Sequence, residues 1–132
     1  MIFVDTSFWV AARHRRDRHH QDALALRETL AEDRLVTSNH VVGETWTFFR
    51  RKDGHATGVE FLDMLDRTAR VDVARVSDDL ERQALRWLRR HDEREYSFVD
   101  ATSFALMRSL KVRQALAFDG DFAAAGFVEL RP

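Results

Sequence analysis

Four acidic residues far apart in the sequence occupy comparable positions beside apolar segments. Asp5 and Asp119 each directly follow a short apolar run, whereas Glu44 and Asp100 fall in the first turns of expected helices. In a parallel α/β sheet these positions meet at one edge. Carboxylates gathered there repel one another and can all ionise only around a cation. Because an all-oxygen cluster suits a hard divalent ion, the pattern predicts a Mg²⁺ or Mn²⁺ site, where the ion can bind phosphate oxygens and activate water.

Three of these positions also have purely structural explanations. Asp5 could cap the helix that follows it. Ser97-Phe98-Val99-Asp100 is close to a capping box, in which the cap could fix the carboxylate while its outer oxygen faces a metal. Asp119-Gly120-Asp121 could form a plain turn. The metal hypothesis therefore depends on the combination of acids rather than on any one of them.

Glu44 could be an exposed acid on the surface of its helix. Its neighbours Val41, Val42, Trp46 and Phe48 are large and apolar, however, so we expect little of this helix to be exposed. This favours a functional role for the Glu44 carboxylate.

Strands and helices are expected to alternate along the chain, which predicts an α/β fold with a mostly parallel sheet of four to five strands and helices on both faces. The expected strands span residues 2–4, 35–37, 71–76, 115–118 and 127–130. Helices are expected over 7–12, 57–67 and 97–110, and also after Asp17, from Ser38 or Asn39, and from Ser77. Thr6 or Ser7 should cap the first helix, and Asp17 the second.

Composition limits the possible classes of protein. A chain of 132 residues is long enough for one domain with one core, so residues 1–132 are expected to form a single domain. The absence of cysteine excludes disulfides and zinc–thiolate sites and suits a reducing compartment. No apolar stretch approaches the length of a membrane span, and Asp5 interrupts the first apolar run too early for a signal peptide. We therefore expect a cytoplasmic protein without membrane association.

The net charge of −1 gives no overall attraction to nucleic acid, so any RNA contact must come from local clusters of basic residues. The basic residues are almost all arginines, which either form bidentate phosphate contacts or simply reflect genome composition. The favoured RNA-binding cluster follows the first helix and comprises Arg13, Arg15, Arg16 and Arg18. A second cluster is Arg50, Arg51 and Lys52, and a third, more consistent with a solvated face, is Arg86, Arg89 and Arg90.

Four motifs together resemble the PIN-domain ribonucleases and, within them, the VapC toxins of type II toxin–antitoxin systems. They are Val4-Asp5-Thr6-Ser7, Asn39-His40-Val41-Val42-Gly43-Glu44-Thr45, Ser97-Phe98-Val99-Asp100-Ala101 and Ala117-Phe118-Asp119-Gly120-Asp121-Phe122. The resemblance covers essentially the whole chain and implies the three-layer PIN fold. It also implies endonucleolytic, magnesium-dependent cleavage of RNA.

By this resemblance, Asp5, Glu44, Asp100 and Asp119 match the catalytic acids of the family. The expected metal ligands are Asp5, Asp100, Asp119 and, less regularly in the family, Asp121. Glu44 is expected to orient or deprotonate the attacking water. The expected supporting hydroxyls are those of Thr6, Ser7 and Ser97.

The resemblance further implies a homodimer and a small antitoxin whose tail covers the acidic pocket. Some of the aromatic side chains of Trp46, Phe48, Phe49 and Phe61 could serve such interfaces, although each could equally belong to the core. The implied RNA target is either transfer RNA or, favoured by residues 39–46 and 91–105, the sarcin–ricin loop of ribosomal RNA.

Two other classes of protein share some of these features. A phosphatase of the haloacid-dehalogenase type has a strand-end acid pair like Asp119 and Asp121, but near its N-terminus and followed by threonine. A phosphoacceptor receiver domain clusters acids too, but this chain has no matching lysine after a late strand. A PIN fold that only binds partners is a third alternative, against which the presence of all four acids argues.

Overall fold

The computed structural model describes all 132 residues, as an alternation of five strands and seven helices. The strands are β1 (Ile2–Val4), β2 (Leu35–Ser38), β3 (Val71–Ala74), β4 (Gln114–Leu116) and β5 (Val128–Glu129). The helices are α1 (Thr6–Arg13), α2 (His20–Thr29), α3 (Asn39–Asp53), α4 (His55–Arg67), α5 (Asp78–Arg90), α6 (Phe98–Leu110) and α7 (Asp121–Ala124).

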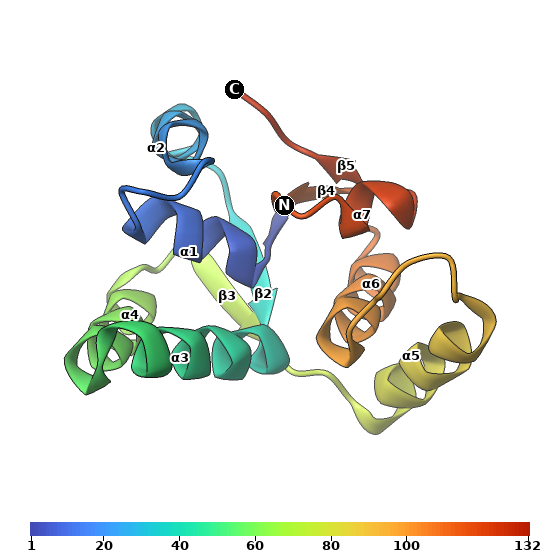
Figure 1. The fold of residues 1–132 in the computed structure, drawn as a ribbon. Coiled ribbons are helices and arrows are strands. Elements are labelled where there is room, and N and C mark those ends of the chain that lie inside the picture. Colours follow the sequence, from blue (N-terminus) through green and yellow to red (C-terminus); the bar gives the residue numbers. More distant parts are fainter.

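All five strands are parallel, in the order β3-β2-β1-β4-β5. The central strand β1 pairs on both sides, with Phe3 opposite Val36 and Ala115, and is buried on both faces. The chain runs outward from β1 to β3 and then crosses back to β4 and β5, so right-handed crossovers put α1–α4 and α5–α7 on opposite faces of the sheet, as Figure 1 shows. The predicted parallel α/β fold is therefore confirmed, with β3 and β5 at the edges of the sheet.

Helix α6 is the most deeply buried helix of the fold. Every residue from Asp100 to Met107 is buried, and Phe104 and Met107 are inaccessible to solvent. Because the side chains around it fix this helix on several sides, it is a rigid support for the acid in its first turn. No helix of the structure combines the length and hydrophobicity that crossing a bilayer requires.

The N-terminal caps of the helices agree in part with those predicted from the sequence. Ser38, Ser77 and Ser97 cap α3, α5 and α6 as predicted. The prediction that Thr6 or Ser7 caps α1 was wrong; the alternative that Asp5 caps it is confirmed, because Asp5 is the N-cap and accepts a hydrogen bond from the backbone N–H of Ser7. Asp17 does not cap α2 either, since its carboxylate accepts from the His19 N–H one residue before the helix begins.

The segment after β4 differs most from the prediction. Strand β4 ends at Leu116 rather than Phe118, because the next backbone groups bond to side chains instead of a strand. The Phe118 N–H donates to the Ser7 Oγ at 3.0 Å, and the Ala117 carbonyl accepts from Arg131 at 2.9 Å. The short helix α7, which begins at Asp121, was not predicted.

The expected interface aromatics fall into two groups. Phe49 and Phe61 are core residues, with 3% and 5% of their surface exposed. Trp46 and Phe48 are only half-buried. The Trp46 ring covers Gly58, which allows α3 and α4 to pack closely. A Cβ atom at position 58 would lie 2.6 Å from the Trp46 Cζ3.

Gly58→Ala should therefore destabilise the protein by about 1–3 kcal/mol through overpacking against Trp46. The matched control is Gly43→Ala on α3, where a Cβ atom meets nothing within 4 Å; it should stabilise by about 0.5–1 kcal/mol, because alanine favours the helix. Urea unfolding of both variants checks the pair. Equal stability of the two variants would contradict the close α3–α4 contact.

Candidate active site

The predicted acids line one open hollow of about 710 Å³ at the carboxyl edge of the sheet, which we call the acidic hollow. It receives side chains from α1, α3, the start of α6 and the loop between β4 and α7. The acids and predicted hydroxyls that line it are Asp5, Thr6, Ser7, Glu44, Ser97, Asp100, Asp119 and Asp121. The structure thus brings together residues that are up to 116 positions apart, from Asp5 to Asp121.

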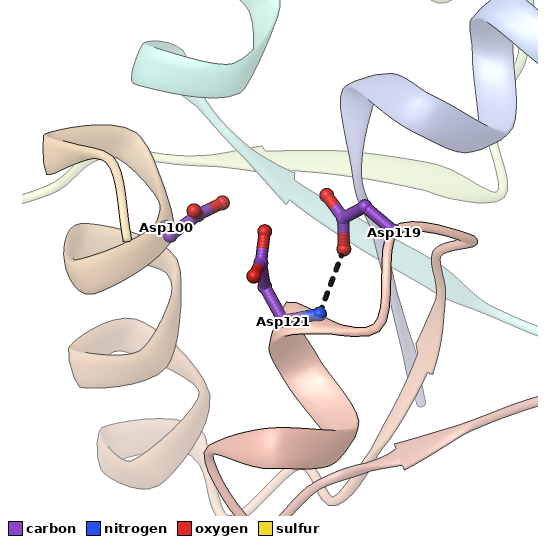
Figure 2. Close-up of side chains that lie close together, drawn as sticks. All are labelled: Asp100, Asp119 and Asp121. Carbon is purple, nitrogen blue, oxygen red and sulfur yellow. Dashed lines mark hydrogen bonds between the residues drawn. The ribbon is translucent and has the colours of Figure 1, made fainter. Parts of the chain in front are cut away.

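Three carboxylates form the tightest group within the acidic hollow. Asp100, Asp119 and Asp121 each offer an oxygen atom, and these oxygens all lie within 4.8 Å of one another (Figure 2). Asp100 is buried, Asp121 is half-buried and Asp119 is exposed at the mouth of the hollow. A small adjustment of the side chains would let one divalent ion contact all three oxygens, and the donor set is the one that Mg²⁺ and Mn²⁺ prefer.

Asp5 lies beside this group rather than in it. Its Oδ2 accepts hydrogen bonds from the Ser7 N–H at 3.1 Å and the Ser7 hydroxyl at 2.7 Å. Only 3% of its surface is exposed. Burial raises the pKa of Asp5 to about 7; the charge of Asp119 and, less strongly, that of Asp100 also raise it, while the two hydrogen bonds from Ser7 lower it.

Desolvation and repulsion between charges also raise the pKa values of Asp100 and Asp119. Burial raises the pKa of Asp100 to about 6, with additional repulsion from Asp119 and Asp121. Partial desolvation also raises the pKa of Asp119, helped by Asp121 and Glu129. A cation bound among these carboxyl groups would favour their ionised form, so Asp5 and Asp100, whose pKa values are near neutral, would lose their protons when it binds.

Asp100 combines the two roles that the sequence left open. Its Oδ2 accepts from the Ser97 N–H at 2.9 Å, and its own N–H donates to the Ser97 hydroxyl at 2.9 Å, which completes a capping box. The cap fixes the Asp100 carboxylate at the N-terminus of α6. The Asp100 side chain nevertheless lies within the three-acid group, so capping and clustering coexist.

The turn from Asp119 to Asp121 is both a turn and part of the acid cluster. The Asp121 N–H donates to the Asp119 Oδ1 at 3.1 Å (Figure 2), and Gly120 between them has a φ of 83°. Arg94, from the loop before α6, donates to the Asp121 Oδ1 at 2.9 Å and to the Asp119 carbonyl at 3.2 Å. Arg94 was not predicted as a site residue, because it lies in an irregular segment with no periodicity that relates it to the acids.

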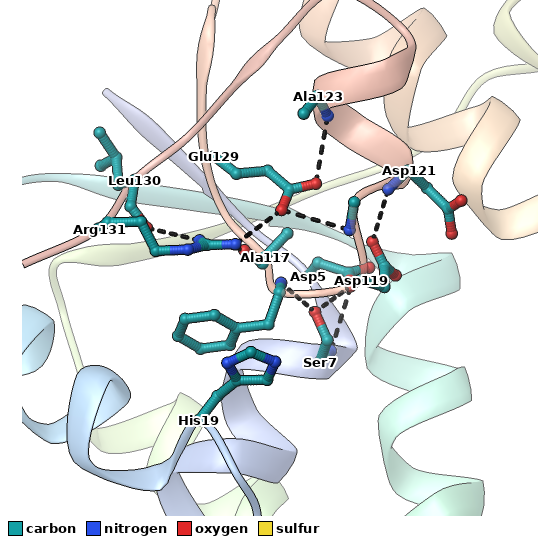
Figure 3. Close-up of polar contacts among 12 residues, drawn as sticks. Asp5, Ser7, His19, Ala117, Asp119, Asp121, Ala123, Glu129, Leu130 and Arg131 are labelled. Carbon is teal, nitrogen blue, oxygen red and sulfur yellow. Dashed lines mark hydrogen bonds and ion pairs between the residues drawn. The ribbon is translucent and has the colours of Figure 1, made fainter.

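Glu129 is a second site residue that was not predicted from the sequence. Its side chain is 5% exposed and accepts from the Gly120 N–H at 3.3 Å and the Ala123 N–H at 3.1 Å. Arg131 pairs with it at 3.0 Å and lies 4.8 Å from the centre of the Phe118 ring (Figure 3). The C-terminal segment thus supports the loop of Asp119 and Asp121 from behind; an acid inside a short apolar strand is the only signal for it in the sequence.

The remaining predicted site residues differ in their surroundings. Glu44 lines the acidic hollow but is exposed, so the expectation that its helix has little exposed face was wrong. The cause is that only Val41, Thr45 and Phe49 of α3 are buried. The Thr6 hydroxyl contacts the Thr45 hydroxyl at 2.9 Å and bonds to no acid. Ser7, in contrast, bonds directly to Asp5.

The four arginines of the favoured RNA-binding cluster do not act as one group. Only Arg18 lines the acidic hollow. Arg13, Arg15 and Arg16 line a second, neighbouring hollow. Arg13 pairs with Glu60 of α4 at 3.0 Å and also donates to Thr57, which directs it toward α4.

The sequence profile of the PIN domain matches residues 2–128. The chain belongs to the PIN-domain family. It is 54% identical to the protein named 23S rRNA-specific endonuclease VapC20 from two strains of Mycobacterium tuberculosis, over 100% of this chain and 99% of the relative. The crystal structure of M. tuberculosis VapC20, titled as a sarcin–ricin-loop-cleaving toxin, superposes with a TM-score of 0.93, at 52% identity and full coverage of both chains.

These relatives confirm the predicted membership in the VapC toxins and the predicted class of enzyme, an endoribonuclease. A toxin–antitoxin complex from Klebsiella pneumoniae matches with a TM-score of 0.70 over 98% of this chain and 97% of the other, but at 13% identity this likeness shows the fold alone. The match to the PIN domain excludes the haloacid-dehalogenase and receiver alternatives. The alternative of a PIN fold without catalysis is separated from an active nuclease by assay of RNA cleavage.

The raised pKa values predict an unusual pH dependence of stability. In the metal-free protein, Asp5 and Asp100 have pKa values of about 7 and 6, whereas in the unfolded chain they ionise near the ordinary aspartate pKa of 3.8. Between these pKa values the native state binds more protons than the unfolded state. The free energy of unfolding of the protein therefore falls as the pH rises through this range. Mg²⁺ favours the ionised carboxylates and should therefore raise Tm more at about pH 8 than at about pH 5.

Calorimetric melting with EDTA and with excess Mg²⁺ across this range checks the prediction. Asp5→Asn, which keeps a side chain able to cap α1, should weaken the dependence of Tm on pH in EDTA. An Mg²⁺-induced rise in Tm of the same size at both pH values would contradict the clustered, partly protonated site.

Proposed function

We propose that the chain is a divalent-metal-dependent endoribonuclease that cuts the sarcin–ricin loop of 23S ribosomal RNA, and that a small antitoxin neutralises it. One observation carries the choice of RNA: the chain shares 54% of its residues, over its full length, with a relative named as a 23S rRNA-specific endonuclease. The gathered carboxylates supply the chemistry but do not by themselves select an RNA. Ribosomal RNA is preferred to transfer RNA as the target because of this identity to the 23S rRNA-specific relative.

The residues have distinct roles in the proposed reaction. Asp100, Asp119 and Asp121 would hold Mg²⁺ or Mn²⁺, which when bound stabilises charge on the phosphate and favours ionisation of water. Asp5 completes the negative pocket with the oxygen atom that is not bonded to Ser7. Glu44, exposed at the wall of the acidic hollow, is placed to orient the attacking water or accept its proton. Ser7 and Ser97 fix the orientations of Asp5 and Asp100.

The proposed partners follow from membership in the VapC toxins. The antitoxin would cover the acidic hollow, where a cationic group could neutralise the clustered carboxylates. We also propose a homodimer, and a cytoplasmic location because the proposed substrate is ribosomal RNA.

Asp100→Asn should abolish the cleavage of a sarcin–ricin-loop hairpin, with a loss of about 100-fold or more, because it removes a carboxylate from the centre of the cluster. An asparagine oxygen can still accept from the Ser97 N–H, so the fold should persist. The matched control is Asp66→Asn, an exposed acid on α4. Initial rates in Mg²⁺, in EDTA and on an anticodon stem–loop hairpin complete the experiment.

The outcomes separate the proposals. Cleavage of the sarcin–ricin hairpin but not of the anticodon hairpin supports the proposed target, and the reverse pattern contradicts it. Asp100→Asn cutting at the wild-type rate would remove this residue from the mechanism. No cleavage of either RNA by the wild-type protein in Mg²⁺ would favour a PIN fold that only binds partners.

A further inference from the structure

Phe48 lies on the wall between the acidic hollow and a second hollow of opposite charge. This second hollow, of about 840 Å³, is lined by basic side chains, and we call it the basic hollow. Its charged or titratable residues are Arg13, His14, Arg15, Arg16, Asp17 and Lys52. Only Val10, Asp17 and Phe48 line both hollows, and Phe48 is the one aromatic side chain among them.

The Phe48 ring is held in place without being buried. It packs 6.0 Å from the Phe49 ring and 5.9 Å from the His14 ring, and the Lys52 Nζ lies 5.9 Å from its centre. The core stripe of α3 is formed by Val41, Thr45 and Phe49. Phe48 lies off this stripe and is half-buried, so its ring contributes surface to both hollows instead of filling the core.

The charges around Phe48 suit a nucleic-acid strand. Arg15, Arg16 and Lys52 form no ion pair within the chain, so their charges are available to phosphate groups. The acidic hollow on the other side would repel phosphates unless a divalent ion is bound there. A strand with one phosphate at the acids and the next phosphates in the basic hollow must cross the wall that Val10, Asp17 and Phe48 form, where Phe48 supplies the only aromatic ring.

We propose that Phe48 is a stacking platform for an unpaired base of the RNA loop, adjacent to the phosphodiester that is cut. Arg15, Arg16 and Lys52 would hold the flanking phosphates on the basic side. The proposal rests on the proposed function and deepens it by assigning how the loop is held. Aromatic stacking is the usual way in which proteins bind splayed-out bases of single-stranded RNA, since every base has a flat face.

The charge pattern favours RNA over a peptide as the occupant. A peptide would need acidic side chains opposite Arg15, Arg16 and Lys52 and a basic one opposite the acids. An RNA strand supplies a phosphate at each regular step and a flat base between successive phosphates. Capture of an antitoxin segment by Phe48 is therefore the competing outcome of the test.

The experiment compares Phe48→Leu with Phe48→Tyr in the Asp100→Asn background, so that the RNA is not cut during the measurement. The probe is a sarcin–ricin-loop hairpin with 2-aminopurine replacing one loop base at a time, and the readouts are Kd from anisotropy and quenching of the 2-aminopurine. Phe48→Leu should weaken binding about tenfold to a hundredfold and abolish quenching at one loop position. Phe48→Tyr, which keeps the ring, should retain both within about threefold.

The matched control is Phe127→Leu, because Phe127 is also half-buried and lies 5.6 Å from a cation, Arg108, but lines neither hollow. It should leave Kd and quenching unchanged. Thermal melts show whether Phe48→Leu is folded. If it is not, the comparison of Phe48→Tyr with Phe48→Trp replaces it, and loss of quenching in both would overturn the proposal.

Failure of the stacking proposal differs from failure of the proposed function. If the wild-type protein cuts the hairpin and Phe48→Leu binds it with unchanged Kd and quenching, only the stacking platform is overturned, whether or not antitoxin binding is weakened. If the wild-type protein neither binds nor cuts this hairpin, the proposed target fails. The Phe48 variants are then compared on unstructured polyadenylate, where equal affinities would overturn the platform as well.

Discussion

Electrostatic repulsion among carboxylates at one edge of the sheet is the constraint on which this structure depends. Asp5 is almost completely buried, Asp100 is buried at a helix start, and Asp119 and Asp121 approach Asp100 closely. Burial and proximity both disfavour ionisation, and the raised pKa values of Asp5, Asp100 and Asp119 reflect this cost. The fold must therefore hold these groups in place against their own repulsion, which it does by placing them on rigid or tethered elements.

Each acid has a different support. Asp5 ends the central strand β1 and caps α1, while Asp100 belongs to the most deeply buried helix. Asp119 lies in neither a helix nor a strand and Asp121 begins the short helix α7, so side chains hold this segment in place. Arg94 bonds to it from one side, and Glu129 with Arg131 from the other. Ser7 joins two of these supports, because it donates to Asp5 and accepts from the Phe118 N–H.

The sequence predicted the parallel sheet and the meeting of the acids, because uninterrupted apolar runs and helix caps are local signals that tertiary packing reinforced. It failed where a long-range contact decided the outcome. Strand β4 ends early because side chains of Ser7 and Arg131 take the next backbone groups. Glu44 is exposed because the flanking Trp46 and Phe48 are themselves only half-buried. Arg94 could not be predicted, since nothing local in the sequence relates it to the acidic loop, and the only signal for Glu129 is its position as an acid inside a short apolar strand.

The most direct test of the central claim is anomalous diffraction from a crystal of the protein grown with Mn²⁺. We expect one strong anomalous peak about 2.0–2.2 Å from carboxylate oxygens of Asp100, Asp119 and Asp121, since these atoms already lie within 4.8 Å of one another. A crystal at saturating Mn²⁺ with no peak in the acidic hollow, or with a peak bound to other residues only, would contradict the claim that these carboxylates gather to bind a divalent ion.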